Sequence, residues 1–371
     1  MVSYNNLLKT TIEMTYPKYL QDKFKKILEG KSIISSTDNL FTLTDTAAKV
    51  SDSDTLLHQL LDALEKQPDA TIAALEDMEY FNPYKYATLF TYENYNDEIL
   101  DKMIDNQLVI RYDEKQCDVC CDITNSGLTI KPTYRKISED IDCLKFNIEL
   151  KGFIPLTENG TRLIKYPILA LIHKNLNTVE IRLDKVKGLF KNNDEYFYTK
   201  QMSYVRDWIV QYLKLEIEAV NLPPVIEFLI PKLNENDQNV VKVAAQAMNL
   251  AKGSKAILDT GISDEFVLPL LGELKNLIKD NVDLFKSNDK TMEINELLEN
   301  FILETEESAS LPWISLAWTH EKKSKAVKVK FSFNSEFTLL QYYGNNAEME
   351  RMNNVTKYLI DNQNEYLRQE A

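Results

Sequence analysis

Apolar side chains recur along this chain with two different spacings, and the spacing changes near residue 108. Before that point they recur every three or four positions, a period typical of amphipathic helices. The clearest run comprises Leu56, Leu57, Leu60, Leu61 and Leu64. Ser51 to Asp54, just before this run, supply N-cap side chains. We therefore expect residues 1–112 to form a mostly helical N-terminal region that ends in a short helix over 96–106.

Between residues 108 and 187 the apolar positions alternate with polar ones, as they do in half-buried strands. The alternation is clearest over 143–150, where one face carries Leu144, Phe146, Ile148 and Leu150. The unbroken apolar run 168–172 predicts a strand buried on both faces. We expect residues 113–200 to hold an antiparallel β-sheet of roughly five or six short strands.

Helical spacing returns over 201–305, which we expect to form a central helical segment. Alternation then returns near 314–318, 327–333 and 337–342, which predicts a C-terminal three-stranded meander, and a closing helix follows it. The predicted fold class is therefore α+β. Its expected parts are a helical region 1–112 and an α+β domain 113–371, comprising the sheet 113–200, the helices 201–305 and the meander with its helix over 311–371.

One part of the central segment, residues 223–251, resembles a HEAT-type helical hairpin. Its second half spaces apolar and small residues as a helix does, at Val240, Val243, Ala244, Ala247 and Leu250. A solenoid requires at least three stacked repeats of one period, and this spacing does not recur over 264–303. The pattern therefore favours an ordinary hairpin, with helices near 225–233 and 238–251.

The composition limits the classes of partner. Hydrophobic residues make up 44% of the 371, enough for a core, while 43 Lys and Arg against 57 Asp and Glu give a net charge of −14. The acidic excess lies in 1–113 (11 basic, 19 acidic) and 201–371 (18 basic, 26 acidic), whereas 114–200 has 14 basic and 12 acidic side chains. Such a surface repels nucleic acid and anionic membranes, so we expect neither as a partner.

Sequence signals for membrane insertion or secretion are lacking. The chain has no run of 18 apolar residues, and its N-terminus has neither the basic nor the apolar segment of a secretion signal. The four cysteines are bunched, which is typical of reduced thiols. We therefore expect a cytoplasmic protein, and its richness in Asn, Lys and Ile indicates an AT-rich bacterial or phage genome.

Residue types that build catalytic sites are scarce, with 9 glycines and 3 histidines. No two glycines lie closer than eight positions, whereas a phosphate-binding loop needs two or three within about six residues. The histidines, His58, His173 and His320, lie far apart in the sequence. We therefore predict no cofactor and favour a protein without catalysis of its own.

The candidate metal ligands are Cys117, Cys120, Cys121 and Cys143, because four thiolates can hold zinc in a tetrahedron. Cys117, Val119, Cys121 and Ile123 nevertheless alternate as in an ordinary strand, which sends Cys120 to the opposite face. The pattern therefore favours small buried side chains over a metal site.

Glu149 and Lys151 form a Glu-x-Lys pair of the kind that metal-dependent nucleases use to hold Mg²⁺ and polarise water. Such a site needs an upstream carboxylate, and Asp142 is the candidate. Strand parity places Asp142 on the face opposite Glu149 and Lys151 unless a bulge intervenes. A Mg²⁺-dependent nuclease using these three residues is the alternative function.

Residues 96–124, a helix followed by an expected hairpin over 108–124, have the layout of a winged helix. The helix exposes Asp97, Glu98, Asp101 and Asp105 against Lys102 alone, which opposes contact with phosphates. A winged-helix nucleic-acid binder is the third hypothesis, and docking of a protein fits the charge better.

An aromatic-rich stretch contains the candidate interaction residues Tyr84, Tyr86, Tyr92 and Tyr95. Binders of single-stranded nucleic acid alternate aromatics with cations, and only Lys85 is interleaved here. Tyrosine offers an apolar ring with a polar tip, which suits contact with a protein. The leading hypothesis is a non-catalytic cytoplasmic protein-interaction or assembly subunit of a bacterial or phage multi-component, defence-type system, binding another protein or a second copy of itself.

Overall fold

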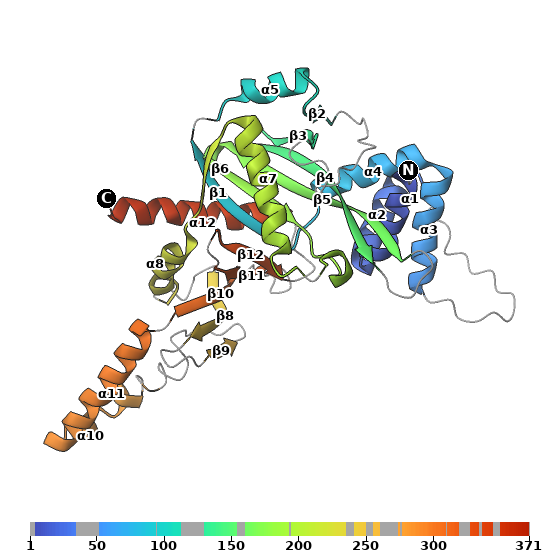
Figure 1. The fold of residues 1–371 in the computed structure, drawn as a ribbon. Coiled ribbons are helices and arrows are strands. Elements are labelled where there is room, and N and C mark those ends of the chain that lie inside the picture. Colours follow the sequence, from blue (N-terminus) through green and yellow to red (C-terminus); the bar gives the residue numbers. More distant parts are fainter. Residues whose placement is uncertain are drawn as a thin grey trace, which may run out of the picture. The chain divides into compact units, whose positions relative to one another are not determined.

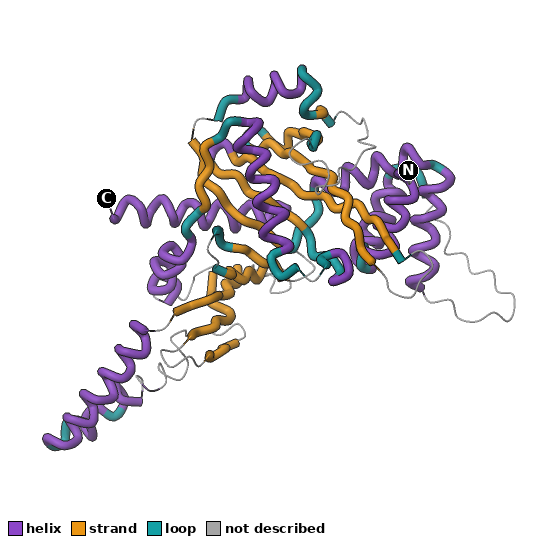
Figure 2. Tube along the Cα trace, viewed as in Figure 1, coloured by secondary structure: helices purple, strands orange, loops and turns teal. Residues whose placement is uncertain are grey.

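The computed structural model describes residues 4–34, 52–93, 95–112, 130–153, 160–192, 194–234, 241–249, 255–259, 274, 277–308, 310–318, 327–333, 336–343 and 349–370. The chain divides into two compact units, Met1–Glu218 and Ala219–Ala371. Both units contain helices and strands (Figures 1 and 2). The predicted α+β class is confirmed.

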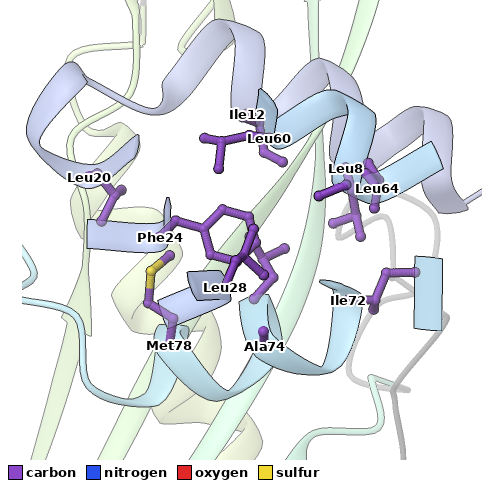
Figure 3. Close-up of a cluster of buried hydrophobic side chains, with 12 residues drawn as sticks. Leu8, Ile12, Leu20, Phe24, Leu28, Leu60, Leu64, Ile72, Ala74 and Met78 are labelled. Carbon is purple, nitrogen blue, oxygen red and sulfur yellow. The ribbon is translucent and has the colours of Figure 1, made fainter. Parts of the chain in front are cut away.

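The first unit begins with four helices, as the leucine spacing predicts. These are α1 (Tyr4–Thr15), α2 (Lys18–Gly30), α3 (Asp52–Lys66) and α4 (Pro68–Tyr80). Their apolar faces meet in one cluster with the Phe24 ring at its centre (Figure 3). Leu8, Leu28 and Leu60 pack there without exposure to solvent. Burial of these apolar faces, rather than helix propensity alone, stabilises helices of this length.

A mixed sheet follows in the same unit. Its strands are, in spatial order, β2 (Ile110–Arg111), β3 (Thr133–Ser138), β4 (Ile141–Phe153), β5 (Thr161–His173), β6 (Thr178–Leu183) and β1 (Tyr86–Glu93), and β7 (Glu216–Ala219) also pairs with β1. The pairs from β3 to β1 are antiparallel, as expected, whereas β2 lies parallel to β3. The helical region and the sheet therefore belong to one unit.

The long hairpin of β4 and β5 fixes which side chains share a face. Its register runs without a shift from the pair Ile141–His173 to the pair Phe153–Thr161. Helix α7 (Phe197–Leu213) covers one face, where the Trp208 ring meets the Phe146 ring edge-on and the indole N–H donates to the Ile130 carbonyl at 2.9 Å. On the other face α1 contacts β5, and α4 lies beside the hairpin (Figure 1).

Strand β1 lies inside the region expected to be helical. Its residues are almost all buried, because β6 flanks it and both of its faces are covered. The segment Tyr86–Glu93 contains Thr88, Thr91 and several aromatic residues, types that fit a pleated strand better than a helix. Strand pairing therefore decides the local structure here.

The second unit contains the expected meander and closing helix. Its elements are α8 (Leu222–Asn234), β8 (Val241–Asn249), β9 (Lys255–Asp259), α10 (Val282–Phe285), α11 (Asp289–Ser308), β10 (Ser310–Trp318), β11 (Val327–Ser332), β12 (Leu339–Tyr343) and α12 (Met349–Glu370). The strand order is β12-β11-β10-β8-β9. Each neighbouring pair in this order is antiparallel. Helix α12 packs on α8 and places Tyr358 edge-on against Trp318 of β10.

The helix predicted over 238–251 is wrong, because β8 is a strand that pairs with β10 and β9. The resemblance of 223–251 to a HEAT-type hairpin fails with it, although α8 forms as expected. Small residues such as Ala244 and Ala247 fit either helical spacing or a strand, so pairing on both sides outweighs helix propensity. Helix α11 confirms the helix expected at 291–303.

Candidate functional site

A cluster of four charged side chains is buried between α4 and the β4–β5 hairpin. Glu76 and Glu79 extend from successive turns of α4, while Lys145 of β4 and Lys165 of β5 lie on the sheet face that α4 covers. All four side chains are at most 1% exposed. Two carboxylates face two ammonium groups, so the cluster is balanced in charge.

Each ammonium group in this cluster contacts both carboxylates. The Lys145 Nζ and Lys165 Nζ lie 3.0 Å and 2.7 Å from Glu79 Oε2, and both also pair with Glu76. The Tyr4 hydroxyl of α1 donates to Glu76 Oε1 at 2.6 Å. Burial alone raises the pKa of Glu76, but Lys145 and Lys165 outweigh burial and hold the pKa below its ordinary value. Each charged group in this cluster therefore has oppositely charged partners, although both lysines contact Glu79 through Oε2 and the buried Glu79 Oε1 accepts no hydrogen bond within the described residues.

A second buried cluster lies on the same sheet face. Arg182 of β6 donates from Nε and Nη2 to the two oxygens of Glu180 at 2.6 and 2.7 Å, a bidentate geometry. The His173 ring of β5 lies 3.2 Å from the same carboxylate. Burial raises the pKa of Glu180, but Arg182 and the hydrogen bond from His173 lower it to about 2. The clusters therefore bring His173 next to an acid, and their members include no Ser, Thr or Cys side chain.

The predicted nuclease residues occupy different surroundings. Asp142 is buried and accepts hydrogen bonds from the Tyr134 and Tyr95 hydroxyls at 2.9 and 3.1 Å. The register of β4 is unbroken, so strand parity holds and Asp142 lies on the face opposite Glu149 and Lys151. Glu149 is half-buried, and Lys151 is exposed. The hairpin therefore does not bring these three residues together.

Potential metal ligands do not converge within the described part of the chain. Within it, no group of three or more His, Cys, Asp or Glu side chains is placed to hold a metal ion. Of the four candidate cysteines, Cys117, Cys120 and Cys121 lie outside the described residues. Cys143 is a free, buried thiol, and burial raises its pKa to about 12 despite the nearby Arg182.

The helix of the predicted winged helix is α5 (Asp97–Asp105). Its buried side chains are Leu100 and Met103, and its four carboxylates are exposed, as expected. Asn96 caps the helix by accepting from the Glu98 N–H at 2.9 Å. The expected hairpin partner over 117–124 lies outside the described residues, while β2 pairs with β3 instead.

The four candidate tyrosines do not share one exposed surface. Tyr84, Tyr86 and Tyr92 are buried, and Tyr95 is half-buried. Tyr86 stacks on Tyr198 of α7, and the Tyr92 ring lies 5.8 Å from the Tyr95 ring, centroid to centroid. A role for Tyr95 in binding stays a prediction.

Among the described residues, several exposed apolar side chains gather instead on α10, α11 and the segment before them, and the two helices contact each other (Figure 1). One apolar face of α11 is buried: Ile302 packs with Ile278, and Leu298 packs against both. A second face carries Ile294, Leu297 and Phe301, which are 50%, 65% and 56% exposed. We call these three residues the α11 stripe. Leu277, Val282 and Leu284 on the preceding segment are exposed as well.

Helix geometry makes the α11 stripe continuous. Positions i, i+3 and i+7 lie on one face, roughly a quarter turn around the helix from the face that Leu298 and Ile302 bury. Sequence reasoning gave 291–303 as a helix and missed the stripe. The spacing alone could not have shown it, because apolar residues at 294, 297, 298, 301 and 302 have the i, i+3, i+4, i+7, i+8 pattern of a single buried face.

Comparison with models of protein families and with curated proteins finds no match for this chain. Among the described helices, none combines the length and apolar character needed to cross a bilayer. The geometry of the described residues is therefore the basis for a functional proposal.

Proposed function

We propose that this protein is a non-catalytic protein-interaction or assembly subunit that binds its partner through the α11 stripe. The observation that carries the proposal is the exposure of Ile294, Leu297 and Phe301 on a helix that already buries another apolar face. Contiguous exposed apolar side chains on a folded protein are typical of sites that another protein covers.

The buried charges support the same proposal. Catalytic acids and bases are usually found in a cleft, where substrate can reach them. Here the two glutamates of α4 and Glu180 are enclosed with cationic partners at hydrogen-bond distance. Such arrangements fix helices to a sheet, so these charges are best understood as part of the architecture.

Co-purification from the native organism tests the proposal. The variant Leu297→Ser/Phe301→Ser removes two residues of the α11 stripe, and Met292→Ser, at an exposed position on the other side of α11, is the matched control. We expect one protein to be recovered in stoichiometric amount with the wild type and the control, and at least about tenfold less of it with the double variant. Exposed substitutions leave stability nearly unchanged, which circular dichroism checks.

Two results would contradict the proposal. One is recovery of the same proteins in the same amounts with all three forms. The other is metal-dependent cleavage of labelled DNA or RNA by the purified protein that is lost in Glu149→Ala, because it would establish the nuclease alternative.

A further inference from the structure

Helix α5 is attached to the first unit largely through polar groups, which converge on one buried carboxylate. We propose that α5 is a hinged cover, held closed by Asp142, that detaches from the sheet while the sheet itself stays folded. The inference goes beyond the proposed function, because it concerns a different part of the chain from the α11 stripe and requires no partner.

Asp142 of β4 is the fixed end of this attachment. Its side chain is 1% exposed, and Oδ1 accepts a hydrogen bond from the Tyr134 hydroxyl of β3 at 2.9 Å. The other oxygen, Oδ2, lies 2.9 Å from Lys174 Nζ and accepts from the Tyr95 hydroxyl at 3.1 Å. One oxygen is therefore bonded within the sheet, and the other holds the two residues that lead to α5.

Two connections run from Asp142 to α5. Tyr95 directly precedes Asn96, the residue that caps the helix. The ammonium group of Lys174, which follows β5, also pairs with Asp97 Oδ1 of the first helical turn at 2.8 Å. Lys174 is 26% exposed and Asp97 is 63% exposed. The lysine therefore bridges an interior carboxylate and a surface carboxylate, and one of its two contacts must break when α5 leaves.

The remaining attachment of α5 is slight. Leu100 and Met103 are its buried side chains, and within the described residues α5 has only sparse contacts with any one other helix or strand. Gln107, just beyond the helix, has a φ of 57°, in the left-handed region that favours glycine. A segment with few buried apolar side chains opens at a lower cost than the core does. We therefore expect α5 to open before the sheet.

A detached α5 does not stay helical. Nine residues are too few for a stable helix in water, because the first turn costs more free energy than its hydrogen bond returns. Exchange of the α5 amide hydrogens therefore reports detachment, whereas amides of β4, which pairs with β3 and β5, report opening of the sheet. Urea distinguishes the two events, since it promotes each opening in proportion to the surface that the opening exposes.

Native-state hydrogen exchange of the full-length chain, over urea concentrations below the unfolding transition, tests the proposal. In the wild type we expect α5 amides to be protected at least about a hundredfold less than those of β4, with little dependence on urea. Equal protection and equal urea dependence in α5 and β4 would overturn the proposal, because α5 would then open only when the whole unit unfolds.

Lys174→Met tests whether closure depends on the bridge to Asp142. The variant leaves a buried carboxylate without its cation, so we expect exchange of α5 to accelerate at least about tenfold. The matched control is Lys102→Met, which removes an exposed pair with Glu98 within α5 at 3.5 Å and should change exchange less than about twofold. An effect of Lys174→Met no larger than that of the control would contradict the role of the bridge.

A double variant separates this bridge from a general loss of stability. In Asp142→Asn the buried charge is absent, so Asp142→Asn/Lys174→Met should exchange in α5 no faster than the faster of the two single variants. Effects that multiply would show that the two residues act independently, and the proposal would fail. If Asp142→Asn does not fold, Tyr95→Phe replaces it. This variant keeps the ring and should accelerate exchange of α5 at least about threefold, and no acceleration would likewise count against Asp142.

Discussion

Lys165→Met is expected to lower the free energy of unfolding of the first unit by about 3–5 kcal/mol. The lysine is fully buried, and its ammonium group pairs with Glu79 at 2.7 Å and with Glu76. Methionine fills a similar volume without the charge, so two buried carboxylates would share the single ammonium group of Lys145. Removing one partner of a buried ion pair leaves a buried charge uncompensated. This costs far more stability than replacing the whole pair by apolar side chains.

Urea unfolding, read by hydrogen exchange of peptides from β4 and β5, measures this loss in the unit that contains the cluster. The matched control is Lys9→Met, which removes an exposed pair with Glu65 at 2.8 Å and should leave the stability nearly unchanged. A loss for Lys165→Met no larger than that of the control would show that the four charges are not closed off from water.

Arg182→Met is expected to lower the free energy of unfolding at pH 7 by as much as Lys165→Met does. We expect this loss to become smaller in acid. In the wild type Arg182 and His173 lower the pKa of Glu180 to about 2 from an ordinary 4.5, although burial raises it. The stability from this pairing is therefore present above pH 4.5 and is lost as the pH falls towards 2. Without Arg182, burial should raise the pKa of Glu180 above 4.5.

Two effects then reduce the difference in the free energy of unfolding between the variant and the wild type as the pH falls from 7 to 3. The variant gains stability because its buried Glu180 takes up a proton on folding, while the wild type begins to lose its ion pair. Urea unfolding at several pH values measures the difference, in which the other titrating groups largely cancel. A difference that stays constant over this range would mean that Glu180 keeps its low pKa without Arg182.

The sequence predicts those helices and strands whose apolar residues have a spacing that fits only one type of element. The alternation over 143–150 and 179–183 gives β4 and β6, and the helical spacing over 56–64 gives α3. It does not identify β8, because alanine and valine at 241–247 fit either spacing and long-range pairing decides between them. Strand β1 is missed for a different reason: its threonine and aromatic residues favour a strand, but the segments on either side of it have helical spacing.

The buried charges show a different limit of sequence reasoning. Lys145 lies on the polar face of a strand, which ordinarily indicates solvent, and Glu76 and Glu79 lie in a helix that also carries Asp69 and Asp77. Nothing in the local sequence marks any of these charges as buried. Their partners lie 66 or more positions away, so the pairing can be recognised only when α4 is placed on the sheet. The α11 stripe is local, but its spacing is that of an ordinary buried face, so only the packing of α11 shows that these side chains are exposed.

Photo-crosslinking in the native cell tests most directly whether this protein acts by binding another one through α11. A photo-reactive phenylalanine analogue would replace Leu297 in the α11 stripe or, as the matched position, exposed Glu296 on the same helix. We predict one discrete crosslinked species from position 297, containing a second protein, and little from position 296. The same pattern at both positions, or no crosslink at 297, would contradict the account.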